Sequence, residues 1–286
     1  MSVAERGSTG LRIVVSFDTT PAGEAALEAA IGLAASLDAE VAGLFVEDVS
    51  LVRMAALPFT REFGLTSALL RPIDTADIER ALRLQAQQTR DLLAAAAAAL
   101  NLRWSFQVVR GQSVNAVFEL SEDRALLVLG AASAGVVARG SVVSAGGRRE
   151  SRPSARQGFR YLSSRPVVVL FDGSERGMRS LAAAHALATR AATRLTVLVT
   201  ADTVEDFDRW RQQARAWVLA QGAAARYVWL KGRSIEGVLQ AVGAENASAL
   251  LLHEDEAPAD RRVLRGLLRE LGCPLVLVSR RRDASG

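Results

Sequence analysis

Cysteine is almost absent from this chain of 286 residues. The single Cys273 excludes an intramolecular disulfide, and the only two histidines, His185 and His253, lie far apart in the sequence. These residues cannot supply the clustered Cys and His ligands of a structural zinc site. We expect Cys273, which precedes Pro274 and an apolar run, to be a packed thiol without a redox role, and we expect no metal at His253.

Long apolar runs are also missing. No run reaches the roughly 20 residues needed to cross a bilayer, and the N-terminal residues Met1–Ser8 contain no apolar segment typical of a secretory signal. Half of the residues are hydrophobic, which is enough for two compact cores in a chain of this length. We expect a cytoplasmic protein with no membrane contact.

Lysine is nearly absent, because every basic residue except Lys231 is arginine. The net charge is +4 and the pI is near 10.1. So much arginine together with so much alanine is typical of a GC-rich genome. No helix-turn-helix or zinc-finger pattern accompanies it, so we expect no nucleic-acid partner.

What the chain does contain is a repeat. The apolar run Val167–Phe171 predicts a strand buried on both faces, and Asp172-Gly173-Ser174 then predicts a turn and the start of an alanine-rich helix. Leu11–Thr20 has the same pattern, and 154 residues separate Phe17 from Phe171. We therefore expect two copies of one α/β unit.

A second match lies further along each copy. Arg110–Val114 corresponds to Lys231–Ile235, and the separation there has fallen to 121 residues, so the second copy is 33 residues shorter. The additional residues of the first copy include Asp48–Ile73, which contain both apolar residues and arginines. Short stretches of this segment have the spacing typical of a helix. This segment predicts a helical flap that either covers its own domain or closes over a partner or ligand.

The domain boundaries follow from these matches. We expect a disordered lead at 1–10, a first domain at 11–147 with the flap at 48–73, a linker at 148–165 with six arginines, a second domain at 166–280 and a tail at 281–286. The expected strands are Leu11–Phe17, Val41–Val46, Trp104–Val109 and Ala125–Leu129, then Val167–Phe171, Leu195–Val199, Arg226–Leu230, Ala249–Leu252 and Leu275–Val278.

The first domain thus has four clear strands and the second has five. We expect the first to lack a regular fifth strand, or to use a short irregular piece near Val142-Val143. Its fourth strand would then be an open edge, which must be covered or paired by the other domain or by a second chain.

The Val-rich strand ending in Asp172-Gly173-Ser174, the alanine-rich helix and the final strand after Cys273-Pro274 resemble the universal stress protein family. Each half looks like one such domain. The resemblance implies two tandem open parallel sheets of strand order 3-2-1-4-5 with helices on both faces. It also implies pairing of the domains within the chain or in a homodimer, and a non-catalytic role in stress response or regulation, together with a protein partner that the sequence does not identify.

The resemblance also implies where a nucleotide would bind. ATP-binding members carry an Asp after strand one and, after strand four, Gly, two residues, Gly, nine residues, Gly, and Ser or Thr. The matching candidates here are Asp18, Gly130, Ser133, Gly140 and Ser141, although Ser133 replaces the second glycine and Gly140 arrives three residues early. Two alternatives therefore remain. Either both nucleotide sites are degenerate, or the first domain binds ATP or another adenine nucleotide.

The second copy departs further from that motif. Asp172 and Ser174 match, but His253-Glu254-Asp255-Glu256 replaces the glycine loop, and three carboxylates would repel a triphosphate. Asp18 and Asp172 themselves either contact a nucleotide or only cap the following helix. Neither a nucleophilic triad, a Walker loop nor a paired-carboxylate motif occurs in the sequence, so we do not expect an enzyme.

Overall fold

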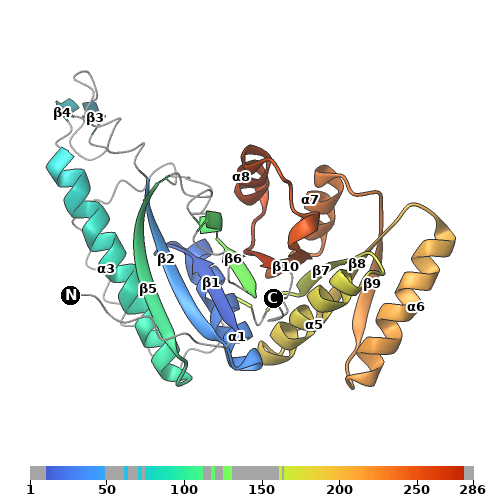
Figure 1. Cartoon of the computed structure of the whole chain (residues 1–286). Coiled ribbons are helices and arrows are strands. Elements are labelled where there is room, and N and C mark those ends of the chain that lie inside the picture. Colours follow the sequence, from blue (N-terminus) through green and yellow to red (C-terminus); the bar gives the residue numbers. More distant parts are fainter. Residues whose placement is uncertain are drawn as a thin grey trace, which may run out of the picture.

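The computed structural model describes residues 11–48, 61–63, 70–72, 75–111, 117–119, 125–130, 161–162 and 164–279. These residues form one nine-stranded sheet in the order β5-β2-β1-β6-β11-β10-β7-β8-β9, together with a separate pair, β3-β4 (Figure 1).

The first half supplies four parallel strands of the large sheet. Their order, β5-β2-β1-β6, is 3-2-1-4 in terms of the first half alone. The elements are β1 (Arg12–Ser16), α1 (Pro21–Leu37), β2 (Glu40–Asp48), α3 (Thr75–Ala99), β5 (Trp104–Gly111) and β6 (Leu126–Leu129). Each expected strand of this half is present, with ends shifted by up to two residues.

The second half supplies the other five strands. Their order, β9-β8-β7-β10-β11, is the expected 3-2-1-4-5, and all neighbours are parallel. The elements are β7 (Val167–Phe171), α5 (Glu175–Arg190), β8 (Leu195–Ala201), α6 (Val204–Ala220), β9 (Ala225–Lys231), α7 (Ile235–Ala244), β10 (Ala249–His253), the 3₁₀ turn η2 (Glu254–Glu256), α8 (Arg261–Glu270) and β11 (Leu275–Val278).

The expectation of two separate sheets was wrong. Strand β11 pairs antiparallel with β6, with Val276 opposite Val128, and this pairing joins the two halves into one sheet. Every residue of β6 is buried, so an unpaired outer edge there would leave backbone groups unsatisfied. The second half therefore covers the open edge that the sequence predicted at the fourth strand. The piece near Val142-Val143 lies outside the described residues.

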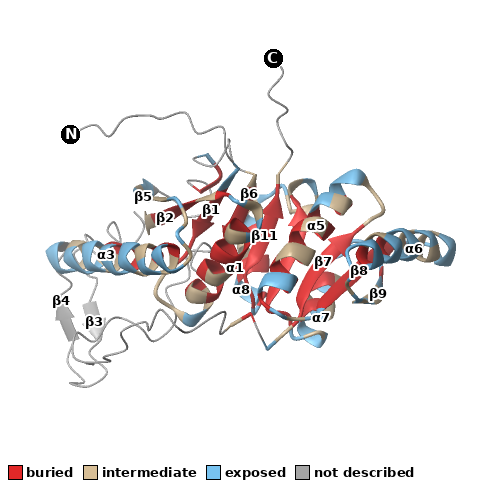
Figure 2. Ribbon diagram, turned by 90° about the horizontal axis from the view of Figure 1, so that it is seen from below, coloured by how far each residue is buried: buried red, intermediate tan, exposed pale blue. Residues whose placement is uncertain are grey.

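Helices cover both faces of the sheet. The core on one face takes its helical residues from α3, α1, α5 and α6, and the core on the other face takes them from residues 117–118, α7 and α8. Figure 2 shows the central strands as the most deeply buried part of the molecule, whereas the edge strands β5 and β9 are partly exposed. The halves also touch outside the sheet, because Arg261 of α8 lies 3.5 Å over the ring of Phe118.

The segment expected as a helical flap is different where it is described. Arg61–Phe63 (β3) and Leu70–Pro72 (β4) pair as antiparallel strands. They lie beyond the N-terminal end of α3, away from the large sheet (Figure 1). Helix was the wrong prediction for these six residues, because apolar spacing alone does not separate a short helix from a short strand. The rest of the segment lies outside the described residues.

No helix among the described residues is both long enough and apolar enough to cross a bilayer.

Candidate functional site

Each half has a switch point where the strand order changes direction. It lies between β1 and β6 in the first half and between β7 and β10 in the second. Ligands of open parallel sheets bind beside the carboxyl ends of the strands at such points. The turns after these four strands are therefore the candidate sites.

The turn after β7 is built around Asp172. Its carboxylate accepts hydrogen bonds from the backbone N–H of Ser174 (3.0 Å) and from the Ser174 hydroxyl (2.6 Å), and it pairs with Arg233 (3.0 Å). Burial alone would raise the pKa of Asp172, but the hydrogen bonds from Ser174 and the Arg233 guanidinium lower it below its usual value. The charge of Asp172 is thus held by groups of the protein itself.

Ser174, and not Asp172, is the residue that caps α5. The Ser174 hydroxyl oxygen accepts from the N–H of Gly177 (3.0 Å), while Asp172 holds the hydroxyl in place. The same arrangement occurs in the first half, where Thr20 caps α1. The expectation that the aspartates cap their helices directly is corrected to this indirect role. The signal in the sequence was the spacing Asp-x-Ser and Asp-x-Thr, typical of Asx turns.

An aromatic ring covers the second-half turn. Gly173 has φ of +77°, and a Cβ atom placed there would lie 2.3 Å from Cδ1 of Trp210. The indole of α6 therefore lies directly against the backbone at this position.

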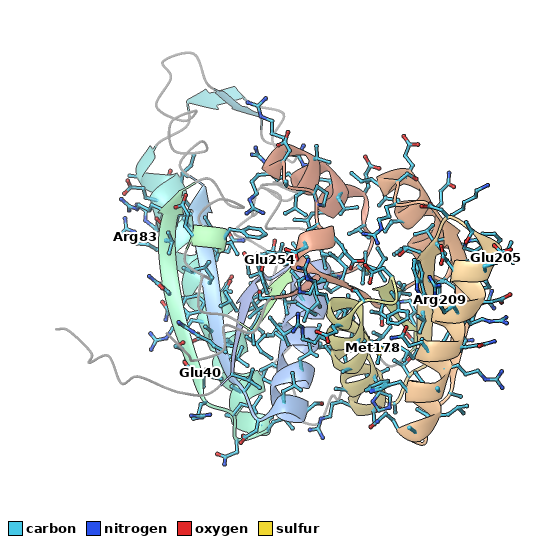
Figure 3. The ribbon with its side chains drawn as sticks, turned by 45° about the vertical axis from the view of Figure 1, so that its right-hand side comes forward. Glu40, Arg83, Met178, Glu205, Arg209 and Glu254 are labelled. Carbon is cyan, nitrogen blue, oxygen red and sulfur yellow. The ribbon has the colours of Figure 1, made fainter. Side chains whose placement is uncertain are left out.

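The acidic loop after β10 forms the turn η2. Nδ1 of His253 accepts from the N–H of Asp255 (3.2 Å), and the Glu256 carboxylate accepts from the N–H of His253 (3.0 Å). Asp255 forms an ion pair with Arg176 in the first turn of α5. Figure 3 labels Glu254 in this turn. The carboxylates that were expected to repel a phosphate group are thus also part of a turn that closes on itself.

His253 lies inside this turn and is only 1% exposed. Burial lowers its pKa; Asp255 opposes this shift, while Arg179 and Arg176 add to it. Because Nδ1 accepts a hydrogen bond, the ring proton lies on Nε2, which has no hydrogen-bond partner among the described residues. A neutral ring with this tautomer cannot take a proton at Nε2, so the geometry does not support His253 as a general base there.

The stability of the protein should therefore fall in mild acid. The unfolded chain protonates His253 below about pH 6.5, whereas the folded state resists protonation because burial disfavours the charged ring and lowers its pKa. The folded pKa is lowered, so this contribution is complete above pH 6.5 and is lost as the pH falls toward the folded pKa. Urea unfolding at pH 7.5 and pH 5.5 measures the difference.

His253→Asn is the informative variant for this prediction, because an Asn side chain also accepts a hydrogen bond but does not titrate. We expect a smaller acid loss in this variant than in the wild type, and an unchanged loss in the control His185→Gln. Burial raises the pKa of Glu256, which gives a contribution of opposite sign that is lost as the pH rises above about 4.5. Equal acid losses in wild type and His253→Asn would contradict the assignment to His253.

Two further observations concern Cys273 and possible metal ligands. Burial raises the pKa of the Cys273 thiol to about 12, so the thiol stays protonated near neutral pH, as expected for a packed residue. The described residues contain no group of three His, Cys, Asp or Glu side chains placed to hold a metal ion.

The first-half site contains two of the five predicted residues. Asp18 accepts from the N–H (3.1 Å) and hydroxyl of Thr20, and the Thr20 oxygen accepts from the N–H of Gly23 (3.2 Å). Gly130 donates its N–H to the carbonyl of Ser16 (3.1 Å). Asp18 and Gly130 thus both lie at the N-terminal end of α1. Ser133, Gly140 and Ser141 lie outside the described residues.

The two sites differ in what surrounds the aspartate. Within the described residues no arginine pairs with Asp18, whereas Arg233 pairs with Asp172. The strand register makes Gly130 the counterpart of His253. The first half therefore has small residues where the second half has larger polar ones: Ala22, Ala26 and Gly130 correspond to Arg176, Ser180 and His253.

Gly130 allows a close approach of strand and helix. A Cβ atom there would lie 3.2 Å from Cβ of Ala26, which is tighter than an ordinary contact. The end of β6 thus lies directly against the start of α1, and the positive end of the helix dipole there favours an anion.

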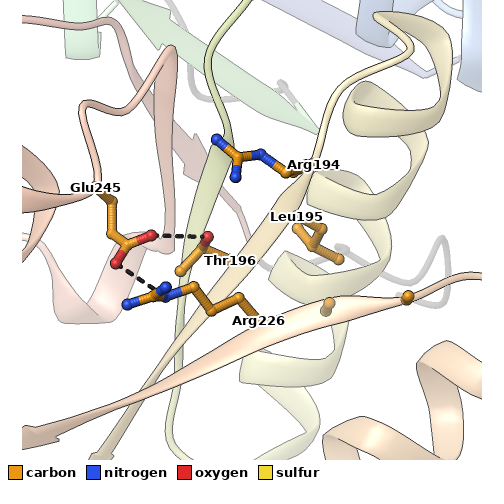
Figure 4. Close-up of a pocket in the computed structure, with 7 residues that line it drawn as sticks. Arg194, Leu195, Thr196, Arg226 and Glu245 are labelled. Carbon is orange, nitrogen blue, oxygen red and sulfur yellow. Dashed lines mark hydrogen bonds and ion pairs between the residues drawn. The ribbon is translucent and has the colours of Figure 1, made fainter.

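A separate cavity of about 200 Å³ lies at the other end of the sheet. It is lined by Arg194, Leu195, Thr196, Ala224, Ala225, Arg226 and Glu245, at the amino ends of β8 and β9. Glu245 accepts from the Thr196 hydroxyl (3.2 Å) and pairs with Arg226 (3.2 Å) (Figure 4). This cavity lies at the opposite end of the strands from the switch points.

No family model and no curated protein matches this sequence. Among solved structures, a universal stress protein from Archaeoglobus fulgidus DSM 4304 is similar with a TM-score of 0.52 and 12% identity, over 94% of this chain and 96% of that one.

Two further structures are similar at lower scores. A putative universal stress protein from Pseudomonas aeruginosa UCBPP-PA14 has a TM-score of 0.46 and 10% identity, over 95% of this chain and 94% of that one. A protein of the universal stress protein family from Burkholderia pseudomallei has a TM-score of 0.32 and 24% identity, over 42% of this chain and 97% of that one. The resemblance to universal stress proteins is confirmed at the level of the fold by the Archaeoglobus structure.

Proposed function

We propose that this chain is a non-catalytic tandem protein of universal-stress type, which acts in stress response or regulation, and whose second half serves as a structural partner of the first. The shared fold supports the type of protein. A regulatory protein of this kind acts by binding other molecules. We propose that this chain binds a protein partner or forms a homodimer.

The self-contained second-half switch point is the observation that carries this proposal. Arg233 pairs with Asp172, Arg176 pairs with Asp255, and Trp210 covers Gly173. A nucleotide would have to displace an indole and break two ion pairs, and it would then meet the carboxylates that these arginines had held.

A second candidate function is sensing of ATP or another adenine nucleotide by the first half. It is favoured by the contrast between the two halves. Asp18 and Gly130 lie together at the start of α1, where the positive end of the helix dipole favours phosphate and where no described arginine pairs with Asp18. Ser133, Gly140 and Ser141 would complete this site.

Calorimetric titration with ATP, ADP and AMP, together with a phosphate-release assay, tests both candidates. We expect no phosphate release and at most one nucleotide per chain. Binding should be lost in Asp18→Ala and in Gly140→Asp but retained in the matched variant Asp172→Ala. A thermal shift gives an independent measurement, since a ligand at 100 times its Kd stabilises the folded state by about 2.7 kcal/mol.

Each outcome decides between the candidates. Phosphate release above background would overturn the non-catalytic role. Two nucleotides per chain, or loss of binding in Asp172→Ala, would contradict a closed second half. No binding up to millimolar nucleotide would remove the sensor and leave the regulatory protein with two degenerate sites.

A further inference from the structure

We propose that Tyr161 is a positioning residue for nucleotide binding in the first half, where it acts through Glu24. This inference rests on the sensor function proposed above. It concerns a tyrosine that no motif indicates, because Tyr161 lies far from Asp18 in the sequence and precedes the first strand of the second half by only six residues.

Two hydrogen bonds fix Tyr161 on helix α1. Its hydroxyl donates to Oε2 of Glu24 (3.0 Å), and its backbone N–H donates to Oε2 of Glu28 (2.8 Å). The next residue, Leu162, has no exposed surface and packs in the core with α1 and α5. The chain that leads into the second half is thus held on the first two turns of the helix that forms the first-half site.

The position of Glu24 gives this contact a consequence for binding. Glu24 lies in the first turn of α1, the turn that Thr20 caps and that Gly130 approaches. The partial positive charge of a helix N-terminus attracts phosphate, and a nearby carboxylate competes with phosphate for it. The Tyr161 hydroxyl holds the Glu24 carboxylate in one place, so the carboxylate cannot turn toward a bound anion.

The second half contains no counterpart of this arrangement. With the spacing of 154 residues that relates the two helices, Met178 and Ala182 stand in place of Glu24 and Glu28. Figure 3 labels Met178 on α5. The tyrosine and its two glutamates therefore belong only to the half whose aspartate has no arginine partner among the described residues.

Affinity for ATP, measured by titration of the full chain, tests the role of the hydroxyl. Tyr161→Phe should weaken binding by a factor of about 2 to 5, the range expected for one charge near a helix N-terminus. Glu24→Gln should strengthen binding by a similar factor, and it should restore the affinity of Tyr161→Phe in the double variant. Tyr227→Phe, which alters the only other tyrosine, should leave the affinity unchanged.

A spectroscopic signal tests the same contact without mutating it. Because the chain has two tyrosines, labelling with 3-fluorotyrosine gives two ¹⁹F resonances, which Tyr161→Phe assigns. We expect ATP to shift the Tyr161 resonance and to leave the Tyr227 resonance in place.

The failures are distinguishable. If ATP does not bind the wild type, the sensor function and this inference both fail. If ATP binds but the Tyr161 resonance stays in place, or if Glu24→Gln weakens binding as Tyr161→Phe does, the sensor stands and Tyr161 has only a structural role. A purely structural role would lower the melting temperature equally with and without ATP.

Discussion

Val276→Asp should unfold both halves of the protein together. Val276 has no exposed surface and lies in β11, which pairs with β10 of the second half on one side and with β6 of the first half on the other. An unpaired carboxylate at this position is desolvated among apolar side chains. We expect the free energy of unfolding to fall by about 4 kcal/mol or more, because a buried charge without a partner is among the most destabilising substitutions.

Hydrogen exchange measured by mass spectrometry shows whether the loss reaches the first half. Amides of β1 and β6 should lose protection to the same extent as those of β7 and β10. Val263→Asp is the matched control, since Val263 is 40% exposed on α8 and its substitution should change stability by no more than about 0.5 kcal/mol. First-half amides that stay protected in Val276→Asp would show that the halves fold independently, despite the shared sheet.

The elements with strong local signals were predicted well. The bounds of Val167–Phe171 and Leu275–Val278 are confirmed to the residue. Each begins or ends at a clear feature: Asp172-Gly173-Ser174 follows the first strand, and Cys273-Pro274 precedes the second. Short apolar runs between turn residues specify a buried strand in any arrangement of the sheet, so these predictions did not depend on the tertiary fold.

The shared sheet was beyond the reach of such local signals. Leu127 and Leu277 face each other across the junction of the halves, although they are 150 residues apart in the sequence. The four-strand count did predict that β6 needed a neighbour. It did not specify which strand would supply it, because pairing between distant strands depends on shape and not on local pattern.

The site shows the same division between local and distant contacts. Asp18 and Gly130 were identified from their positions after strands one and four, and the turn formed by His253–Glu256 was correctly singled out as different. Arg176 and Arg233 were missed as partners of the acids. Each arginine reaches its carboxylate from another segment, Arg176 from the first turn of α5 and Arg233 from the loop before α7, and the sequence alone gives no distance between such segments.

Gly173→Ala should destabilise the protein by about 2 to 5 kcal/mol. The left-handed backbone at φ of +77° costs an alanine about 1 to 2 kcal/mol. The new methyl group would also lie 2.3 Å from Cδ1 of Trp210, so the indole must move, and overpacking of this kind costs about 1 to 3 kcal/mol more. Urea unfolding measures the sum.

Gly222→Ala separates the two contributions. Gly222 has a similar φ of +69°, but a Cβ atom there would meet nothing within 4 Å, so this variant should lose only the backbone part. The excess loss in Gly173→Ala then reports the contact with Trp210, and it should shrink in the double variant with Trp210→Ala, because the two residues are in contact and their effects are coupled. Equal losses of unfolding free energy in Gly173→Ala and Gly222→Ala would mean that Trp210 does not press on the turn. The second-half site would then be more open than it is in the structure.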